Sequence, residues 1–253
     1  MANKNSNYQG KNIWLIGASF GIGEELYRQF SEAGAKLIIS GRSLEKLQQI
    51  IGENKNHLAL PMDVTDENSV NLAVEKLQQN FAKIDLIIFC AGIYQPMNVD
   101  NFDLKKSKEI SKTNYVGMLN LLAAILPIIK QKKLAHLAII SSVASYFGMN
   151  NSLSYGASKA ALSNLTMSLY LELKKYDVKV QLINPGFVKT RLTDQNNFKM
   201  PLMITPQKAA EVIIKELGSN KFEIFFPKIF VWMMKIIGLL PYKMQLKILL
   251  QVK

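Results

Sequence analysis

Cysteine and an export signal are what this sequence most clearly lacks. Cys90 is its one cysteine, which excludes an intrachain disulfide framework and argues against a cysteine-based zinc site. The opening MANKNSNYQGKN has no apolar core of signal-peptide length. We therefore expect a cytoplasmic protein, and we predict no metal centre.

Arginine is also scarce, although the chain is strongly basic. Of the 31 lysines and arginines only Arg28, Arg42 and Arg191 are arginine, and the formal net charge is +12. Proteins that read nucleic-acid bases rely on arginine and on recognisable recognition elements, neither of which is evident, so we expect no nucleic-acid partner. The charge suits an anionic lipid surface, an acidic carrier protein or a phosphorylated cofactor, or is simply a lysine-rich solvated surface.

What the sequence does contain is a regular alternation of short apolar runs and longer amphipathic ones. The expected strands span residues 12–17, 36–40, 57–62, 85–92, 136–142 and 178–185, and the expected helices span 22–33, 43–52, 67–81, 103–130, 155–176 and 206–217. Nearly continuous apolarity is typical of strands covered on both faces, as in a parallel sheet. This βαβ pattern predicts a single α/β domain, 1–221, with a Rossmann-like doubly wound sheet, followed by a C-terminal extension of amphipathic helices, 222–253.

The loop GASFGIG, residues 17–23, follows the first expected strand and opens the first expected helix. Glycines at 17, 21 and 23 allow a tight turn and a close approach to a pyrophosphate, which helix N-terminal amides can bind. The GxxxGxG spacing differs from the commoner GxGxxG fingerprint, and glycines in any strand-to-helix turn could look similar. In this βαβ context we interpret the loop as a phosphate-binding site.

The second expected strand ends in SGR, residues 40–42. A site that prefers NAD(H) usually offers an acidic side chain to the ribose hydroxyls here, and Gly41 offers none. Arg42 can pair with a 2′-phosphate through a charge-assisted contact, unless it is only a surface cation that starts the next helix. The sequence therefore favours NADP(H) over NAD(H).

Two tyrosines are followed by a lysine four residues later, Tyr155 by Lys159 and Tyr170 by Lys174. Spacing alone does not distinguish these pairs, because residues four apart are neighbours on any helix. Thirteen residues before Tyr155, however, lies Ser142 at the carboxyl end of an expected strand, where doubly wound folds bind their ligands. We therefore predict that the first pair is functional and the second structural.

Six motifs together resemble the short-chain dehydrogenase/reductase family, over about residues 10–217. They are GASFGIG, CAG at 90–92, Asn114 in KTNYVG, Ser142, YGASK and NPGFVKT at 184–190. The resemblance implies a catalytic tetrad of Asn114, Ser142, Tyr155 and Lys159. Tyr155 would be the general acid/base, with a pKa lowered by Lys159 and by an oxidised nicotinamide. Ser142 would hydrogen-bond the substrate oxygen, Lys159 would also hold the nicotinamide ribose, and Asn114 would position a water.

The same resemblance implies a cofactor site built from several loops. Its residues are Gly17, Ser19, Phe20, Gly21, Ile22, Gly23, Arg42, Asp63, Val64, Cys90, Ala91, Gly92, Tyr155, Lys159, Pro185, Gly186, Val188 and Thr190. Asp63 would contact the adenine, although a helix cap or turn residue would look the same in the sequence. Ile16 and Cys90 depart from the family, which usually has threonine and asparagine there, so two polar groups that brace the cofactor loop and the central strand are missing.

The C-terminal extension is dense in large apolar residues, with lysines at 228, 235, 243, 247 and 253. Because Lys235 and Pro241 interrupt the apolar runs, we expect two helices separated by a turn rather than a membrane-spanning helix. The extension lies on an anionic membrane surface as an interfacial hairpin, or it packs on the domain or another subunit and closes the substrate cleft. Either arrangement favours a lipophilic substrate, as do the apolar residues of segment 190–203, which we expect to form a mobile lid.

The sequence thus predicts an NADP(H)-dependent oxidoreductase that interconverts a carbonyl and an alcohol on a lipophilic substrate. A 3-oxoacyl-(acyl carrier protein) reductase is the nearest enzymatic alternative, since the basic surface would suit an acidic carrier. A non-catalytic NADP-binding regulator is an alternative of another class. We expect the protein in the cytoplasm, with peripheral attachment to the inner membrane face as an option, and the resemblance implies a homodimer or homotetramer built around the helices at 103–130 and 155–176.

Overall fold

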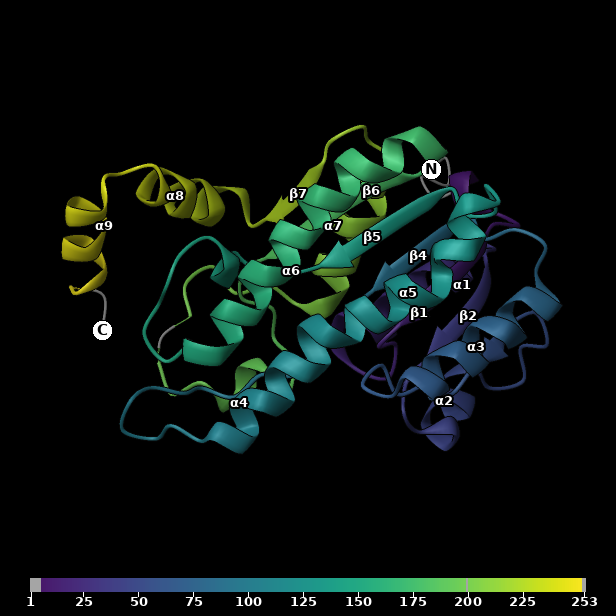
Figure 1. Ribbon diagram of the computed structural model, residues 1–253, viewed down its shortest axis with the longest axis horizontal. Coiled ribbons are helices and arrows are strands. Elements are labelled where there is room, and N and C mark those ends of the chain that lie inside the picture. Colours follow the sequence, from purple (N-terminus) through teal and green to yellow (C-terminus); the bar gives the residue numbers. More distant parts are fainter. Residues whose placement is uncertain (1–5, 199, 252–253) are drawn as a thin grey trace.

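A parallel sheet of seven strands forms the centre of the molecule (Figure 1). The structure, a computed structural model, describes residues 6–198 and 200–251; Lys199 of the expected lid and Lys253 of the tail lie outside these ranges. The strand order is β3-β2-β1-β4-β5-β6-β7, a doubly wound arrangement. The strands are β1 (Asn12–Ile16), β2 (Lys36–Ser40), β3 (Leu58–Ala59), β4 (Leu86–Phe89), β5 (His136–Ile140), β6 (Lys179–Pro185) and β7 (Glu223–Phe226).

Helices cover both faces of this sheet. They are α1 (Gly21–Glu32), α2 (Leu44–Ile51), α3 (Glu67–Asn80), α4 (Leu104–Ser111), α5 (Gly117–Lys130), α6 (Leu153–Glu172), α7 (Pro206–Leu217), α8 (Lys228–Gly238) and α9 (Tyr242–Leu249). Residues of α3, α5 and α6 join one buried cluster, and residues of α1, α2 and α7 join the other. In β1, Trp14 and Ile16 belong to the first cluster, and Ile13 and Leu15 to the second. Both faces are therefore buried, which explains the continuous apolar runs and confirms the predicted fold class.

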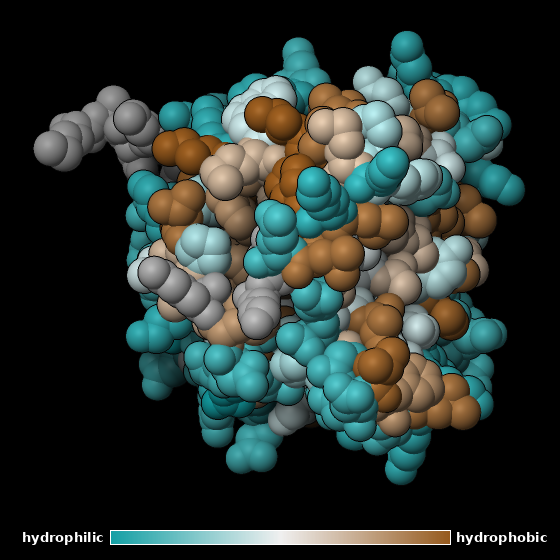
Figure 2. Space-filling view, turned by 90° about the vertical axis from the view of Figure 1, so that its left-hand side faces the viewer, coloured by the Kyte–Doolittle hydropathy of each residue, from teal (hydrophilic) through white to brown (hydrophobic). Residues whose placement is uncertain are grey.

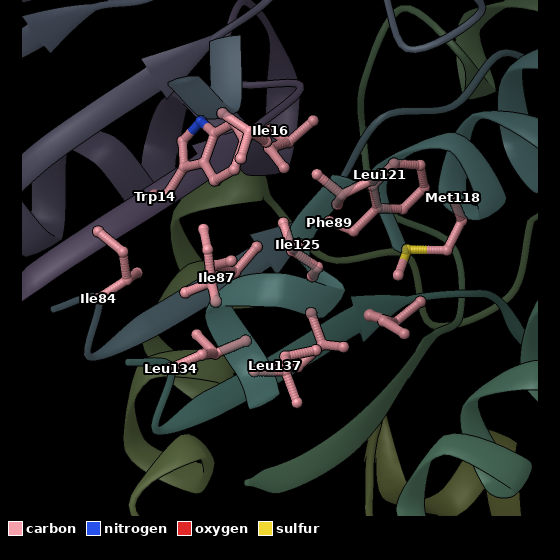
Figure 3. Packing of buried hydrophobic residues seen from close by; sticks show 14 of the residues in the cluster. Trp14, Ile16, Ile84, Ile87, Phe89, Met118, Leu121, Ile125, Leu134 and Leu137 are labelled. Atoms are coloured by element: carbon pink, nitrogen blue, oxygen red, sulfur yellow. The ribbon is translucent and has the colours of Figure 1, made fainter. Parts of the chain in front are cut away.

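The core beneath α5 holds the strands that lead into the ligand-binding edge of the sheet (Figure 3). Phe89 of β4 packs there with Leu121 and Ile125 of α5. Trp14 of β1 is fully buried, and its Nε1 donates a hydrogen bond of 2.8 Å to Ser40 Oγ, so its polar atom is satisfied. This bond ties β1 to the carboxyl end of β2, and β1 pairs with β4 on its other side.

The helical run expected at 103–130 contains an irregular turn. Between α4 and α5 lies a π-helical turn, Lys112–Val116, in which hydrogen bonds reach one residue further than in an α-helix. Asn114 lies in this turn and is fully buried. At Gly117, just after it, a Cβ would lie 2.7 Å from Val64 Cγ2, so this glycine allows α5 to approach the loop after β3.

Leu104–Lys130 is the one helical run of the described residues whose length and composition would allow it to cross a membrane. Its residues Met118, Leu121 and Ile125 are fully buried in the core, as in a core helix of a globular domain. The tail helices α8 and α9 have 11 and 8 residues, fewer than the roughly 20 that a span requires.

The sheet contains one strand that the sequence analysis assigns to the tail. Residues Glu223–Phe226 form β7, which pairs in parallel with β6. The sheet therefore extends beyond the expected boundary at 221/222, because FEIFF is an edge strand rather than the start of the extension. What remains of the extension is α8 and α9, separated at Pro241 as expected, and Figure 1 shows them projecting from the end of β7.

Candidate active site

The predicted site residues gather along the carboxyl ends of the strands. A cleft with a volume of about 990 Å³ runs along this edge. It is lined by every residue predicted for catalysis or cofactor binding except Gly23 and Asn114, which are buried behind it. This is where doubly wound folds bind their ligands.

Two glycines allow main-chain segments to touch at one end of the cleft. A Cβ at Gly17, whose φ is +88°, would lie 2.6 Å from the main-chain nitrogen of Ala91. A Cβ at Gly23 would lie 2.2 Å from the Gly17 carbonyl oxygen. No side chain fits at either position unless the backbone moves. The glycine loop is therefore packed between the end of β4 and the first turn of α1.

Gly41, at the end of β2, is in contact with the glycine loop. A Cβ at this position would lie 2.4 Å from Ser19 Oγ. Ser19 thus occupies the space in which a side chain at position 41 would begin. A side chain at position 41 would therefore require the Ser19 hydroxyl to rotate away.

Three basic side chains line the same end of the cleft: Arg42, Lys46 and Arg191. Arg42 is exposed and precedes Ser43, whose Oγ caps α2 by accepting a hydrogen bond of 3.2 Å from the Lys46 amide. The other two cations lie over the Phe20 ring, at 4.1 Å for the Arg191 guanidinium carbon and 5.7 Å for Lys46 Nζ. The sequence analysis missed Lys46 and Arg191, although the helix-start position of Lys46 near Arg42 is a usable signal.

Cys90 lies between the end of β4 and the first turn of α1. Its amide donates to the Ile16 carbonyl at 2.8 Å. Burial raises the pKa of Cys90 to about 11, although Lys159 and the Gly23 main chain lower it. The thiol therefore stays protonated at neutral pH.

Asp63 is a turn residue that also faces the cleft. Its Oδ1 accepts hydrogen bonds of 2.9 Å from both the amide and the hydroxyl of Thr65, whereas the N-cap of α3 is Asp66. Asp63 and Val64 both line the cleft. The turn role is thus observed, and the contact with an adenine stays a prediction.

Tyr155 and Ser142 meet where the cofactor end of the cleft joins its apolar end. Ser142 Oγ accepts a hydrogen bond from the Ala144 amide at 3.1 Å. Burial raises the pKa of Tyr155 to about 12, although the neighbouring Ser142 side chain lowers it. In the protein alone the phenol is therefore neutral. The lowered pKa that the resemblance implies is not produced by the chain itself, because desolvation outweighs the stabilisation of phenolate.

Lys159 is buried next to Tyr155 on α6. Its Nζ lies 5.8 Å from the centre of the Tyr155 ring and donates a hydrogen bond of 3.0 Å to the Ile140 carbonyl. Burial lowers the pKa of Lys159 to about 8, so the ammonium form dominates only below that pH. A Cβ at Gly92 would lie 3.4 Å from this Nζ, so the glycine of CAG keeps space open beside the ammonium.

Asn114 braces the loop after β4 from behind the cleft. Its Oδ1 accepts from the Ile93 amide at 2.8 Å, and its Nδ2 donates to the Ile93 carbonyl and to Ser158 Oγ at 3.0 Å each. Both amide hydrogens are therefore in use. The side chain acts here as a structural clamp, and the water that the resemblance assigns to Asn114 stays a prediction.

Tyr94 is a cleft residue that the sequence analysis missed. Its ring packs edge-on against Tyr155, with centroids 4.8 Å apart, and its hydroxyl donates to Asn196 Oδ1 at 2.7 Å. Gln195 Nε2 donates to the Tyr94 carbonyl at 3.1 Å. Segment 190–203, the expected lid, is thus hydrogen-bonded to a residue that touches the tyrosine. Only the position of Tyr94 just after the CAG motif could have indicated it.

Apolar side chains of the tail form the opposite end of the cleft. The tail residues that line it are Phe230, Met234, Ile237, Leu246, Leu249 and Leu250. The Phe187 ring contacts those of Phe230 and Phe198, at centroid distances of 5.6 and 6.0 Å. A Cβ at Gly186 would lie 3.1 Å from both Phe230 Cδ1 and Pro227 Cδ, so this glycine of NPGFVKT allows α8 to approach. The inner side of α8 therefore packs on the domain, one of the two arrangements considered for the extension.

A polar cluster, which we call the Glu223 latch, fastens α8 to the sheet. Glu223 of β7 accepts hydrogen bonds from Tyr146 Oη at 2.5 Å, from Asn184 Nδ2 at 2.7 Å and from Lys235 Nζ. The Lys235 ammonium also lies 4.4 Å from the centre of the Phe225 ring. Burial raises the pKa of Glu223, but the hydrogen bonds outweigh it and leave the pKa below its ordinary value of 4.5. The lysine expected on the outer surface of the tail is thus paired with the domain.

Other candidate groups lie away from the cleft. Tyr170 packs on Phe222, with ring centroids 5.0 Å apart, and neither it nor Lys174 lines the cleft, in agreement with a structural role. His57 and His136 do not line it either. Among residues 6–198 and 200–251, no three His, Cys, Asp or Glu side chains are grouped so that they could hold a metal ion.

Comparisons with known proteins agree with this arrangement. A family model described as short chain dehydrogenase matches residues 11–201. The chain is similar to an uncharacterized oxidoreductase of Myxococcus xanthus, with 32% identity over 217 residues, or 84% of this chain and 86% of that protein.

Two solved structures show the same fold. One is a short chain dehydrogenase from Burkholderia cenocepacia in complex with NADP, with a TM-score of 0.84, 22% identity and coverage of 96% of this chain and 98% of that one. The other is a 3-ketoacyl-(acyl-carrier-protein) reductase from Brucella melitensis complexed with NADH, with a TM-score of 0.78, 23% identity and coverage of 86% and 97%.

Proposed function

The chain belongs to the short-chain dehydrogenase/reductase family of oxidoreductases, and we propose that it uses NADP(H) to interconvert a carbonyl and an alcohol on a lipophilic substrate. One observation carries the proposal. Tyr155 and Ser142 line the cleft between an end of glycines and cations, beside β1 and β2, and an apolar end beside β6 and β7. A dinucleotide suits the first end and an apolar substrate suits the second.

Tyr155 is the proposed proton donor to the substrate oxygen during reduction, and the acceptor during oxidation. Ser142 is held by the Ala144 amide, so its hydroxyl has a fixed position from which to donate to the same oxygen. The nearby Lys159 ammonium favours the phenolate form electrostatically.

The residues at the polar end fit a nicotinamide dinucleotide, which would supply or accept the hydride. Gly21 and Ile22 line the cleft at the start of α1, where the amides of a helix N-terminus can hold a pyrophosphate. Arg42 and Lys46, at the capped start of α2, are the proposed partners of a 2′-phosphate. The NADP complex of the similar dehydrogenase from Burkholderia cenocepacia supports this choice, while the NADH complex of the Brucella melitensis reductase is the reason to test it.

The apolar end supports a lipophilic substrate. The Phe187 ring contacts both Phe198 and Phe230 along this wall, and Met234 and Ile237 extend it. Such a wall binds aliphatic or aromatic groups through burial of apolar surface and offers few hydrogen bonds to a polar substrate.

The experiment is a titration of NADPH against NADH, followed by a panel of ketones, aldehydes and acyl thioesters monitored by cofactor absorbance. We expect tighter binding of NADPH and a kcat/KM that rises with the apolar size of the carbonyl substrate. A preference for NADH would overturn the assignment of Arg42. A preference for small polar carbonyls would overturn the assignment of the apolar wall.

A 3-oxoacyl-(acyl carrier protein) reductase is a second candidate, which the similarity to the Brucella melitensis reductase and the net charge of +12 favour. In that case acyl thioesters on an acidic carrier would be much better substrates than free ketones in the same panel. If a non-catalytic regulator is the correct class, no carbonyl in the panel will be turned over although NADPH binds.

We also propose that the protein is a homodimer or homotetramer in the cytoplasm. On the outer side of α6, Met167 and Leu171 are 53% and 68% exposed, which supports an interface with a second copy there. Light scattering of the purified protein measures this, and a monomer would contradict it.

A further inference from the structure

Helix α8 is apolar on two sides, and the domain covers only one of them. Val231 and Met234 are buried against the domain. On the other side the exposed fractions are 72% for Ile229, 55% for Trp232, 57% for Met233 and 59% for Ile236. These positions recur every three or four residues and form one helix face. An apolar helix face of this size on a monomer normally has an occupant.

Helix α9 continues this surface. Its exposed apolar residues are Tyr242, Met244 and Leu246, and Leu239 and Leu250 extend the surface at the ends of the two helices. Figure 2, which looks at the side of the molecule where α8 and α9 lie, shows hydrophobic residues interspersed with hydrophilic ones across this face. We call the exposed side of α8 and α9 the tail face.

The charge of the tail face has one sign. From Ile224 to its end the sequence contains five lysines and no acidic residue. Lys235 is paired with Glu223, whereas Lys228, Lys243 and Lys247 are exposed. An exposed apolar surface with lysines around it is what an interfacial helix presents to anionic lipid, because the lysine stems lie along the acyl boundary and the ammonium groups reach the headgroups.

We propose that the tail face docks on an anionic phospholipid bilayer. A second copy of the chain is a poorer occupant, because a two-fold interface would bring identical lysine-rich faces together with no carboxylate to pair them. An acidic carrier protein would pair with the lysines, but it would leave the large aliphatic and aromatic part of the face without a partner. A bilayer satisfies both the apolar residues and the cations.

Docking would also bring the mouth of the cleft to the membrane. Met234 and Ile237 on the inner side of α8, and Leu246 and Leu250 of the α9 region, line the cleft. Leu246 and Leu250 are at the same time 55% and 81% exposed, so the cleft wall and the tail face are continuous. An apolar substrate dissolved in the bilayer would therefore enter between α8 and α9; this second step rests on the proposed function, whereas docking itself does not.

The test is co-sedimentation of the full-length protein with vesicles of phosphatidylglycerol and phosphatidylcholine in equal amounts, and with vesicles of phosphatidylcholine alone. We expect binding to the mixed vesicles that weakens as salt rises, and much weaker binding to phosphatidylcholine. The triple variant Lys228→Gln/Lys243→Gln/Lys247→Gln should bind the mixed vesicles about a hundredfold more weakly, at about fivefold for each lysine.

Matched variants separate the tail face from general charge and apolarity. Lys55→Gln/Lys76→Gln/Lys83→Gln removes the same charge from exposed lysines outside the tail and should bind as the wild type does. Ile236→Ser should weaken binding about tenfold. Leu72→Ser, at a position on α3 that is 57% exposed against 59% for Ile236, should have no effect.

Three results would overturn the proposal. They are no association with anionic vesicles, an equal loss of vesicle binding in the two triple lysine variants, or a homo-oligomer that Ile236→Ser dissociates. Tyr155→Phe keeps its tail and should bind vesicles as the wild type does, so docking can be judged even if the proposed catalysis fails. If docking holds, the tail lysine triple should lower turnover of a ketone carried in anionic vesicles and leave turnover of a water-soluble ketone unchanged.

Discussion

The two ends of the cleft are built by different means. At the cofactor end, main-chain atoms meet main-chain atoms: Gly17 touches Ala91, and Gly23 touches the Gly17 carbonyl. At the tail end, the wall consists of flexible apolar side chains such as Phe230 and Met234. A wall of backbone contacts tolerates almost no substitution, whereas a wall of side chains can change its shape and keep its chemistry. The first end is therefore suited to one fixed ligand and the second to a class of substrates.

The largest effect should come from the residue where the two ends meet. Tyr155→Phe removes the proton donor and leaves both walls in place, so kcat should fall by about a thousandfold while NADPH binding is kept. Tyr170→Phe, in the second tyrosine–lysine pair, is the matched control and should retain full activity. Single-turnover kinetics with fluorescence titration of NADPH measures both, and equal losses of kcat in the two variants would contradict the role of Tyr155 as proton donor.

The next largest effect should come from adding one methyl group at the cofactor end. Gly17→Ala should destabilise the fold by about 3 kcal/mol and abolish nucleotide binding, because its Cβ would lie 2.6 Å from the Ala91 nitrogen. Gly10→Ala separates the cost of a positive φ from the cost of the close contact. The φ of Gly10 is +72°, but a Cβ there would have nothing within 4 Å. It should therefore cost only about 1 kcal/mol. Thermal unfolding measures both, and equal costs would mean that backbone conformation, not the close contact, decides.

A smaller effect is expected from opening the tail end at the Glu223 latch. Glu223→Gln keeps the shape and removes the charge, so α8 should be held less tightly by about 2 kcal/mol. Hydrogen exchange of the α8 amides should increase while that of α1 stays the same. Asp85→Asn is the control, since the Asp85 side chain is 21% exposed, against 19% for Glu223, and is paired with a lysine outside the tail, Lys11.

Acid should act on the latch as this substitution does. The pKa of Glu223 in the folded protein is lower than in the unfolded chain, so its contribution to stability is present above the unfolded value of 4.5 and is lost as the pH falls through the folded value. The wild type and Glu223→Gln should therefore become alike in α8 exchange at acid pH. A difference that persists there would exclude the charge as the cause.

The smallest effect should come from a substitution that changes cofactor preference at the cofactor end without disrupting its backbone. Arg42→Gln should weaken the binding of NADPH by about 1.5 kcal/mol, a little over tenfold in Kd, and leave the binding of NADH unchanged. Arg28→Gln is the control, because Arg28 is already paired with Glu24 on α1. Isothermal titration with both nucleotides measures the ratio, and parallel weakening of NADPH and NADH would exclude a specific 2′-phosphate contact.

The cofactor end could be predicted from the sequence because its determinants are local. The glycines of GASFGIG, CAG and NPGFVKT mark turns within short segments of the sequence. All of the predicted cofactor residues except Gly23 line the cleft. Their steric reasons were not visible, however. The contact between Gly41 and Ser19 joins two loops 22 residues apart, and nothing in either loop alone indicates it.

The tail end was harder to predict because its contacts are distant in the sequence. Glu223 meets Tyr146, 77 residues earlier, and Asn184, 39 residues earlier. The short strand Glu223–Phe226 was hidden because the apolar residues that follow it look the same in composition. The pKa of Tyr155 in the protein alone also depends on distant residues, because the burial that outweighs Ser142 is produced by the whole fold and not by the YGASK motif.

The π-turn at Lys112–Val116 determines which side chains of α5 face the sheet. Each residue advances an α-helix by about 100°, so deleting one residue here would rotate α5 by that angle relative to α4. Either Asn114 would then turn away from Ile93, or Met118 and Leu121 would leave the sheet. The extra residue of the π-turn thus changes the direction in which later side chains point. Asn114 can then hold the loop after β4, while Met118 and Leu121 of the same helical run pack in the core.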